Sequence, residues 1–262
     1  MACLRVLALL VLAAAATTTP SETAAPREQV TTEEASMKPK VIFFDVNETL
    51  LDLEGMRTSV SAALGGRDDL LPLWFSTMLH HSLVDSATKR YHPFGEIGVA
   101  ALMMVAETND IALSEDEAKQ AILEPLRSLP AHPDVRPGLQ ALKEQGYTLV
   151  SLTNSSNAGV KTQLTNAGLA DLFDRMLTVE ELEIYKPNLA VYRWALDRMN
   201  VKPEEAMMVA AHGWDIAGIE AAGMHGVFVA RPGKALYPLG DPPDLVVKDL
   251  IELSEIMLSR AQ

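Results

Sequence analysis

Short apolar segments alternate with helical patterns along most of this chain, and that alternation limits the fold more than any other feature. Strand-like runs are predicted at Val41–Phe44, Tyr147–Leu152, Met176–Val179, Ala206–Ala210, Gly226–Ala230 and Leu245–Val247. Helical patterns lie near or between the later runs, at Pro137–Glu144, Ala158–Ala167, Leu189–Met199 and Asp215–Ala222. Because strands that alternate with such helices form βαβ units, the sequence predicts an α/β fold with a Rossmann-like, three-layer core around a parallel sheet.

The stretch between the first and second strand-like runs is long and helical throughout. Its helical patterns lie at Gly55–Leu64, Leu70–Val84, Phe94–Glu107 and Ser114–Ser128. Ser114 is followed by three acidic residues, which is typical of a helix N-terminus. An insertion after the first strand would lie over the carboxyl ends of the sheet. We therefore expect a core of residues 37–53 and 129–262 and an inserted helical cap of residues 54–128.

Residues 1–36 differ from the rest of the chain. Arg5 precedes an apolar run, Val6–Ala16, which is too short to span a bilayer comfortably and has small residues at its end. This resembles a secretory signal peptide or an otherwise disordered leader. An organelle transit peptide and a translation start at Met37 are the alternatives, so the compartment stays open between secretion, an organelle and the cytoplasm. The single cysteine, Cys3, lies in this segment and does not indicate a redox compartment.

Composition narrows the class of partner. The chain has 262 residues, 48% of them hydrophobic, which supports a globular protein with a large core. Its net charge of −13, with no compensating run of Lys or Arg, argues against nucleic acid as a partner. We expect a small-molecule substrate and no membrane contact in the mature form, and we leave open whether the chain forms a homodimer.

Polar residues follow several of the predicted strands. They are Asp45 and Thr49 after the first strand, Thr153 and Asn154 after the second, Lys186 after the third, and His212, Trp214 and Asp215 after the fourth. Asp45 alone could equally begin a turn. Parallel strands, however, bring their carboxyl ends to one edge of the sheet, where ligands bind. The set therefore predicts an active site at that edge.

These residues resemble, in order and spacing, the motifs of the haloacid dehalogenase superfamily. The resemblance rests on Asp45 with Thr49, on Thr153, on Lys186 before a proline and on Asp215, and it covers residues 38 to about 260. It implies that Asp45 is a nucleophile that forms a covalent ester. It also implies that Lys186 balances nearby negative charge and that Thr153 fixes the reacting group.

Two departures from the superfamily motifs indicate which branch of the superfamily the chain resembles. Phosphatases of the superfamily carry a second acid two residues after the nucleophile, where this chain has Asn47, which cannot act as a general acid. They also bind Mg²⁺ through an acid at the position of Ala211, and losing one carboxylate weakens such a site severely. A phosphatase acting on a small phosphorylated metabolite is thus disfavoured, although it stays an alternative, as does a non-catalytic protein of this fold.

The remaining features resemble the L-2-haloacid dehalogenase branch. That resemblance implies metal-independent, cofactor-free hydrolysis of the carbon–halogen bond of a small 2-haloacid, with Asp215 orienting the water near Lys186. Substrate contacts are expected from Val46, Asn47, Asn154, Tyr192, His212 and Trp214. Among them, the backbone N–H groups of Val46 and Asn47 would hold the carboxylate, and the NH₂ group of Asn154 would receive the halide.

Three positions differ from that branch. Phe75 follows Trp74 where the branch has an arginine, and Arg90 or Lys89 is the nearest replacement cation by sequence. The branch commonly has serine at the position of Ala210 and asparagine at that of His212. Two readings of His212 remain open: it orients the water, or it is a strand-end histidine satisfied by backbone.

Overall fold

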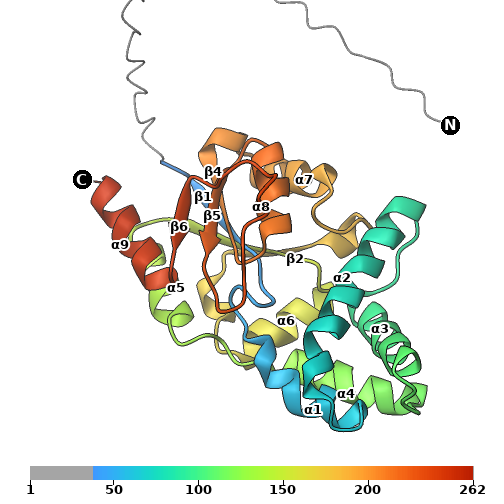
Figure 1. The fold of residues 1–262 in the computed structure, drawn as a ribbon. Coiled ribbons are helices and arrows are strands. Elements are labelled where there is room, and N and C mark those ends of the chain that lie inside the picture. The colour runs from blue at the N-terminus through green and yellow to red at the C-terminus, as the bar shows by residue number, and fades with distance from the viewer. Residues whose placement is uncertain (1–37, 262) are drawn as a thin grey trace, which may run out of the picture. The chain divides into compact units, whose positions relative to one another are not determined.

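The core of the protein is a six-stranded parallel sheet (Figure 1). In the computed structural model, which describes residues 38–261, the strand order is β3-β2-β1-β4-β5-β6. The strands are β1 Val41–Phe44, β2 Thr148–Thr153, β3 Arg175–Thr178, β4 Ala206–Ala210, β5 His225–Val229 and β6 Leu245–Val247. The predicted α/β class and parallel sheet are confirmed. The expected signal segment, Cys3 and the alternative start Met37 lie outside the described residues.

Strand β1 lies in the middle of the sheet, between β2 and β4. Phe44 is in register with Ser151 of β2 on one side and with Val209 of β4 on the other. The chain leaves β1 toward β2 and β3 and then crosses back to β4. The carboxyl ends of β1 and β4 are therefore the switch point of the sheet, where open α/β folds bind their ligands.

Helices cover both faces of the sheet. They are α5 Val135–Glu144, α6 Asn157–Asn166, α7 Leu189–Met199, α8 Gly213–Ala221 and α9 Leu250–Ala261. Helices α5 and α9 pack against each other, and α7 packs with α8 (Figure 1). A methyl group on Gly138 of α5 would lie 2.5 Å from Cβ of Leu250, so this glycine permits the close approach of α5 and α9. Helix α9 was not predicted from the sequence.

The inserted segment forms the helices α1 Arg57–Ala63, α2 Leu71–Thr88, α3 Phe94–Thr108 and α4 Glu115–Arg127, which gather at one end of the sheet (Figure 1). The predicted cap at Ser114 is confirmed, because its backbone N–H donates to Glu117 at 2.9 Å and its hydroxyl accepts from the Glu117 amide. Trp74 Nε1 of α2 donates to Gly98 O of α3 at 2.8 Å. The limits of the cap at residues 54 and 128 stay an interpretation.

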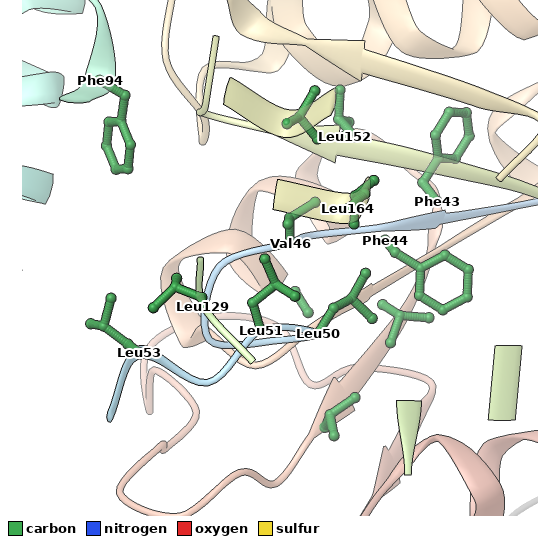
Figure 2. Close-up of a cluster of buried hydrophobic side chains, with 14 of the residues drawn as sticks. Phe43, Phe44, Val46, Leu50, Leu51, Leu53, Phe94, Leu129, Leu152 and Leu164 are labelled. Carbon is green, nitrogen blue, oxygen red and sulfur yellow. The ribbon is translucent and has the colours of Figure 1, made fainter. Parts of the chain in front are cut away.

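A buried apolar cluster fixes the turn that follows β1. Val46, Leu50 and Leu51 are each 0% exposed, and they pack in the same cluster as Leu129 and Leu164 (Figure 2). The turn is thereby anchored to the core by its apolar side chains.

Of the helices within residues 38–261, none combines the length and the apolar character that crossing a membrane requires.

Candidate active site

Asp45 stands directly after β1, at the switch point of the sheet. Its backbone N–H donates to Val209 O of β4 at 3.0 Å. The amides of Leu50 and Leu51 both donate to Val46 O, at 2.9 and 3.0 Å, and close a tight turn. Because the apolar side chains of the turn are buried, Asp45 is held in a fixed place while its own side chain meets other polar groups.

Three side chains surround the Asp45 carboxylate. Thr49 Oγ1 donates to Oδ2 at 2.6 Å, Lys186 Nζ donates to Oδ1 at 2.9 Å, and His212 Nδ1 lies 3.3 Å from Oδ2. The Thr49 hydroxyl accepts from the Ala211 amide at 3.0 Å, which fixes its direction. Burial raises the pKa of Asp45, but Lys186, His212 and Thr49 together lower it well below its usual range. Asp45 is therefore ionised, the form that a nucleophile needs.

Lys186 is buried between two carboxylates. Its Nζ lies 2.9 Å from Asp45 and 2.7 Å from Asp215 Oδ2, and its side chain is fully shielded from solvent. Its backbone N–H donates to Asn154 Oδ1 at 3.1 Å, which ties this loop to the end of β2. Although burial lowers the pKa of Lys186, the charges of Asp215 and Asp45 raise it above its ordinary value. Lys186 thus stays a cation.

Both oxygens of Asp215 are occupied. Oδ2 accepts from Lys186, and Oδ1 accepts from the Tyr192 hydroxyl at 2.5 Å. Burial raises the pKa of Asp215, the charge of Lys186 lowers it, and the nearby Asp45 raises it further. Asp215 is 0% exposed and holds Lys186 in place, and the expected orientation of water by Asp215 stays a prediction.

Tyr192 is buried and donates its hydroxyl hydrogen to Asp215. Its ring is 0% exposed. Gly218 of α8 permits this packing, since a Cβ there would lie 2.5 Å from the Tyr192 hydroxyl oxygen. The hydroxyl of Tyr192 is committed to Asp215, and the expected substrate contact from Tyr192 stays a prediction.

His212 joins Asp45 to a second acid, Glu48. While Nδ1 faces Asp45, Nε2 lies 2.8 Å from Glu48 Oε2. Burial lowers the pKa of His212, but the carboxylates of Asp45 and Glu48 outweigh it and raise the pKa to about 9. His212 is thus an imidazolium at neutral pH. Of the two readings left open by the sequence, the backbone-satisfied histidine is wrong.

Glu48 and Lys234 were not found by sequence reasoning. Glu48 has a φ of 64°, a left-handed conformation that no pattern in the sequence predicts. Lys234 Nζ pairs with Glu48 Oε1 and lies 5.7 Å from the centroid of the Phe75 ring. Lys234 follows β5, so extending the strand-end argument to that strand would have found it.

Aromatic rings enclose His212. Its ring is stacked with Phe75 at 6.2 Å and with Trp214 at 5.0 Å between centroids, each with 25° between planes. Trp214 also lies 5.8 Å beneath Lys186 Nζ. Within residues 38–261, the buried Trp214 Nε1 has no acceptor. The predicted contact from Trp214 therefore has a free donor, and it stays a prediction.

Both ends of the Asn47 side-chain amide make hydrogen bonds to other side chains. Its Nδ2 donates to Ser155 Oγ at 3.2 Å, and its Oδ1 accepts from Gln163 Nε2 at 2.9 Å. The Thr153 hydroxyl accepts from the Ser155 amide at 3.1 Å. Asn47 and Thr153 thus share Ser155 as a neighbour, and the reacting-group role of Thr153 stays a prediction.

The backbone N–H groups of Val46 and Asn47 make no hydrogen bond to the described part of the chain. They precede Glu48, whose left-handed conformation turns the backbone sharply. Successive free N–H groups in such a turn form a concave site for an anion. Their predicted contact with a carboxylate is therefore sterically reasonable, and it stays a prediction.

Arg90 does not replace the arginine missing at Phe75. It is exposed and lies just past the end of α2. The helix rises by about 20 Å between Phe75 and its end at Thr88, and Arg90 lies beyond that end. The expectation was wrong because closeness in sequence on one helix is not closeness in space.

An open cleft of about 680 Å³ adjoins His212. Glu48, His212 and Lys234 line it from the core, and Phe75 and Leu79 line it from α2. A cavity of about 710 Å³ lies among α2, α3 and α4, but none of the predicted site residues lines it. His212, which contacts Asp45, lines this cleft, whereas Asp45 itself does not.

Ala211 stands where the phosphatases of the superfamily carry a metal-binding acid. It contributes only its backbone N–H to the site. Across residues 38–261, no group of three or more His, Cys, Asp or Glu side chains is arranged to hold a metal ion.

Comparisons with known proteins agree on one family. A family model described as haloacid dehalogenase-like hydrolase matches residues 39–223. The (S)-2-haloacid dehalogenase 1 of Pseudomonas sp. (strain CBS-3) is 31% identical over 220 residues, covering 84% of this chain and 96% of that protein. A solved structure of a dehalogenase with intermediate complex is 26% identical, with a TM-score of 0.78 and 84% and 97% of the two chains covered. For the fold alone, the L-2-haloacid dehalogenase from Xanthobacter autotrophicus with chloropropionic acid covalently bound has a TM-score of 0.78 at 22% identity, covering 84% and 98%.

Proposed function

Because the chain belongs to the haloacid dehalogenase-like hydrolase family, we propose that it hydrolyses the carbon–halogen bond of a small 2-haloacid with Asp45 as nucleophile. The observation that carries this proposal is the ionised Asp45, held by Lys186 and Thr49, with Asn47 two residues further on. An amide cannot protonate a leaving oxygen, whereas a halide leaves without a proton. The activity named for the Pseudomonas relative supports the same substrate class.

In the first step, one Asp45 oxygen attacks the carbon that bears the halogen, and the halide departs with the bonding electron pair. The product is an ester between Asp45 and the 2-carbon of the acid. Thr49 and Lys186 hold the carboxylate in the attacking orientation, which lowers the entropic part of the barrier. Asn154 Oδ1 accepts a hydrogen bond from the backbone N–H of Lys186. The NH₂ group of Asn154 and Trp214 Nε1 are therefore the donors for the departing halide.

The free N–H groups of Val46 and Asn47 are suited to the substrate carboxylate. They would set the direction of the acid relative to Asp45.

In the second step, water attacks the carboxyl carbon of the Asp45 ester. Esterification removes the Asp45 charge, one of the two charges that raise the pKa of His212. His212 then releases a proton to solvent and accepts one from the attacking water, while Glu48 orients the ring. The tetrahedral intermediate collapses to the Asp45 carboxylate, and its remaining hydroxyl proton passes to the departing 2-hydroxy acid. The cycle consumes one water and releases one halide and one proton.

None of these steps requires a metal ion or an organic cofactor, so we propose metal-independent catalysis. Lys186 supplies the positive charge that stabilises the oxyanion of the tetrahedral intermediate.

The test is halide release by the full chain from 2-chloropropionate, chloroacetate and fluoroacetate, with a chelator present. We expect release from at least one acid and no release by Asp45→Asn. The proposal is abandoned if no acid yields halide, and phosphate release that requires added Mg²⁺ would favour the phosphatase alternative.

Assembly and processing stay separate proposals. A homodimer stays an open prediction, which light scattering of the purified protein tests directly. Residues 1–36 stay open between a targeting segment, a disordered leader and a segment before a start at Met37, and N-terminal sequencing of the native protein distinguishes removal from retention.

A further inference from the structure

The cleft beside His212 has two unlike walls. Leu71, Phe75 and Leu79 of the inserted helices form an apolar wall, and Glu48, His212 and Lys234 form a charged one. Its volume of about 680 Å³ is in the range of sites that take small molecules. A charged wall facing an apolar one suits a ligand with an ionic group on a hydrocarbon body.

Three long cationic side chains line this cleft, and two of them are committed elsewhere. Arg231 is buried and donates both to Asp134 and to the carbonyl oxygen of Thr49. Arg57 pairs with Glu54 in an exposed position at the rim. Arg231 thus serves the fold, and Arg57 lies where water screens it.

Lys234 differs because it shares its acid with another cation. Glu48 contacts Lys234 through Oε1 and the imidazolium of His212 through Oε2. One carboxylate therefore faces two positive charges, and His212 also contacts Asp45, so Lys234 is the cation of this wall that has only a share of a single carboxylate. The Lys234 side chain is 21% exposed, and its ammonium lies over the Phe75 ring. A lysine with three donors on a flexible stem can keep one bond to Glu48 and offer another to a ligand.

Lys234 is linked to the nucleophile through two intervening side chains. Three successive contacts join it to the nucleophile, from Lys234 to Glu48, from Glu48 to His212 and from His212 to Asp45. The N–H groups of Val46 and Asn47 can direct a carboxylate, but they carry no full charge. A full positive charge at the cleft wall is what desolvating an anionic substrate requires.

We propose that Lys234 binds the carboxylate of the substrate and so selects anionic 2-substituted acids over neutral analogues. This inference rests on the proposed function, of which it specifies the recognition step. It places the selecting charge on the loop after β5 and not on the inserted helices.

The test compares the full-length wild type with Lys234→Gln, Lys234→Arg and the control Arg90→Gln, a cation outside the cleft. The first readout is the Kd of 2-hydroxypropionate, the product acid, and of its neutral amide, each measured by calorimetry. We expect Lys234→Gln to weaken binding of the acid roughly ten- to a hundredfold, the range for one hydrogen bond to a charged group, and to leave the amide unchanged. Lys234→Arg should keep most of the acid affinity, and Arg90→Gln all of it.

The second readout is the kinetics of 2-chloropropionate hydrolysis. We expect Lys234→Gln to raise KM by a similar factor and to change kcat less. Equal binding of the acid by wild type and Lys234→Gln overturns the assignment, and so does equal weakening of acid and amide, because a residue that only holds Glu48 would affect both. A wild type that binds the acid through Lys234 but releases no halide overturns the proposed function alone.

Discussion

Replacing Lys186 by methionine tests the electrostatic design of the site. In the wild type, Asp45 and Asp215 lie 2.9 Å and 2.7 Å from the same ammonium, so their nearest oxygens are within about 6 Å of each other. Without Lys186, two buried carboxylates at this distance repel each other by about 3 kcal/mol at an effective dielectric constant of 20. Removing one partner of a buried pair costs about 3–5 kcal/mol in general. We therefore expect Lys186→Met to lose about 3–5 kcal/mol of unfolding free energy at pH 7.

The loss should shrink as the pH falls. In Lys186→Met, one of the two carboxyls has a folded-state pKa above its unfolded value, so proton uptake on lowering the pH favours the folded state. Urea unfolding at pH 7 and pH 5 measures this difference against the wild type. Lys40→Met is the control, because its pair with Glu205 is exposed and should contribute no more than about 1 kcal/mol. A loss below about 1 kcal/mol at pH 7, with no recovery at pH 5, would refute the reasoning.

Three more substitutions probe the neighbours of Lys186 and Asp45. Tyr192→Phe leaves a buried oxygen of Asp215 without its donor, so urea unfolding should show a loss of about 1–3 kcal/mol, and an unchanged midpoint would contradict this. The pKa of His212 is raised from 6.5 to about 9, so the stability that His212 contributes is complete below pH 6.5 and is lost as the pH rises toward 9. The unfolding free energy of His212→Gln should lack this slope between pH 6 and 9. Gly218→Ala puts a methyl group 2.5 Å from the Tyr192 hydroxyl, so kcat for 2-chloropropionate should fall while the KM changes little, and an unaltered kcat would show that the Tyr192 position is not needed.

Much of the fold follows from local pattern. The alternation of apolar runs with helical stretches predicted the parallel sheet, and each predicted strand lies within two residues of an observed one. The capping signal at Ser114 located the start of α4 correctly. Helix α9 was missed because it follows the last strand, where no further strand marks its end. Its burial against α5 is a tertiary contact that sequence does not display.

The site was predictable where it depends on strand ends and not where it depends on side-chain direction. Asp45, Lys186 and Asp215 meet because parallel strands end at one edge, and the contacts at 2.9 and 2.7 Å bring the three together. The bond from Tyr192 to Asp215 could not be predicted, because spacing on a helix does not say which neighbour its hydroxyl will meet. Glu48 could not be found because its importance comes from a left-handed backbone conformation.

The most direct test of the account is to follow the oxygen of water into Asp45. The full chain is allowed a single turnover of 2-chloropropionate in heavy-oxygen water, with enzyme in excess over substrate, and the peptide that contains Asp45 is then weighed by mass spectrometry. If water attacks the carboxyl carbon of an Asp45 ester, the first labelled oxygen remains in the Asp45 carboxylate and the 2-hydroxy acid product is unlabelled. Label in the product with none in the Asp45 peptide would mean that water attacks the substrate directly, and the covalent role of Asp45 would be wrong.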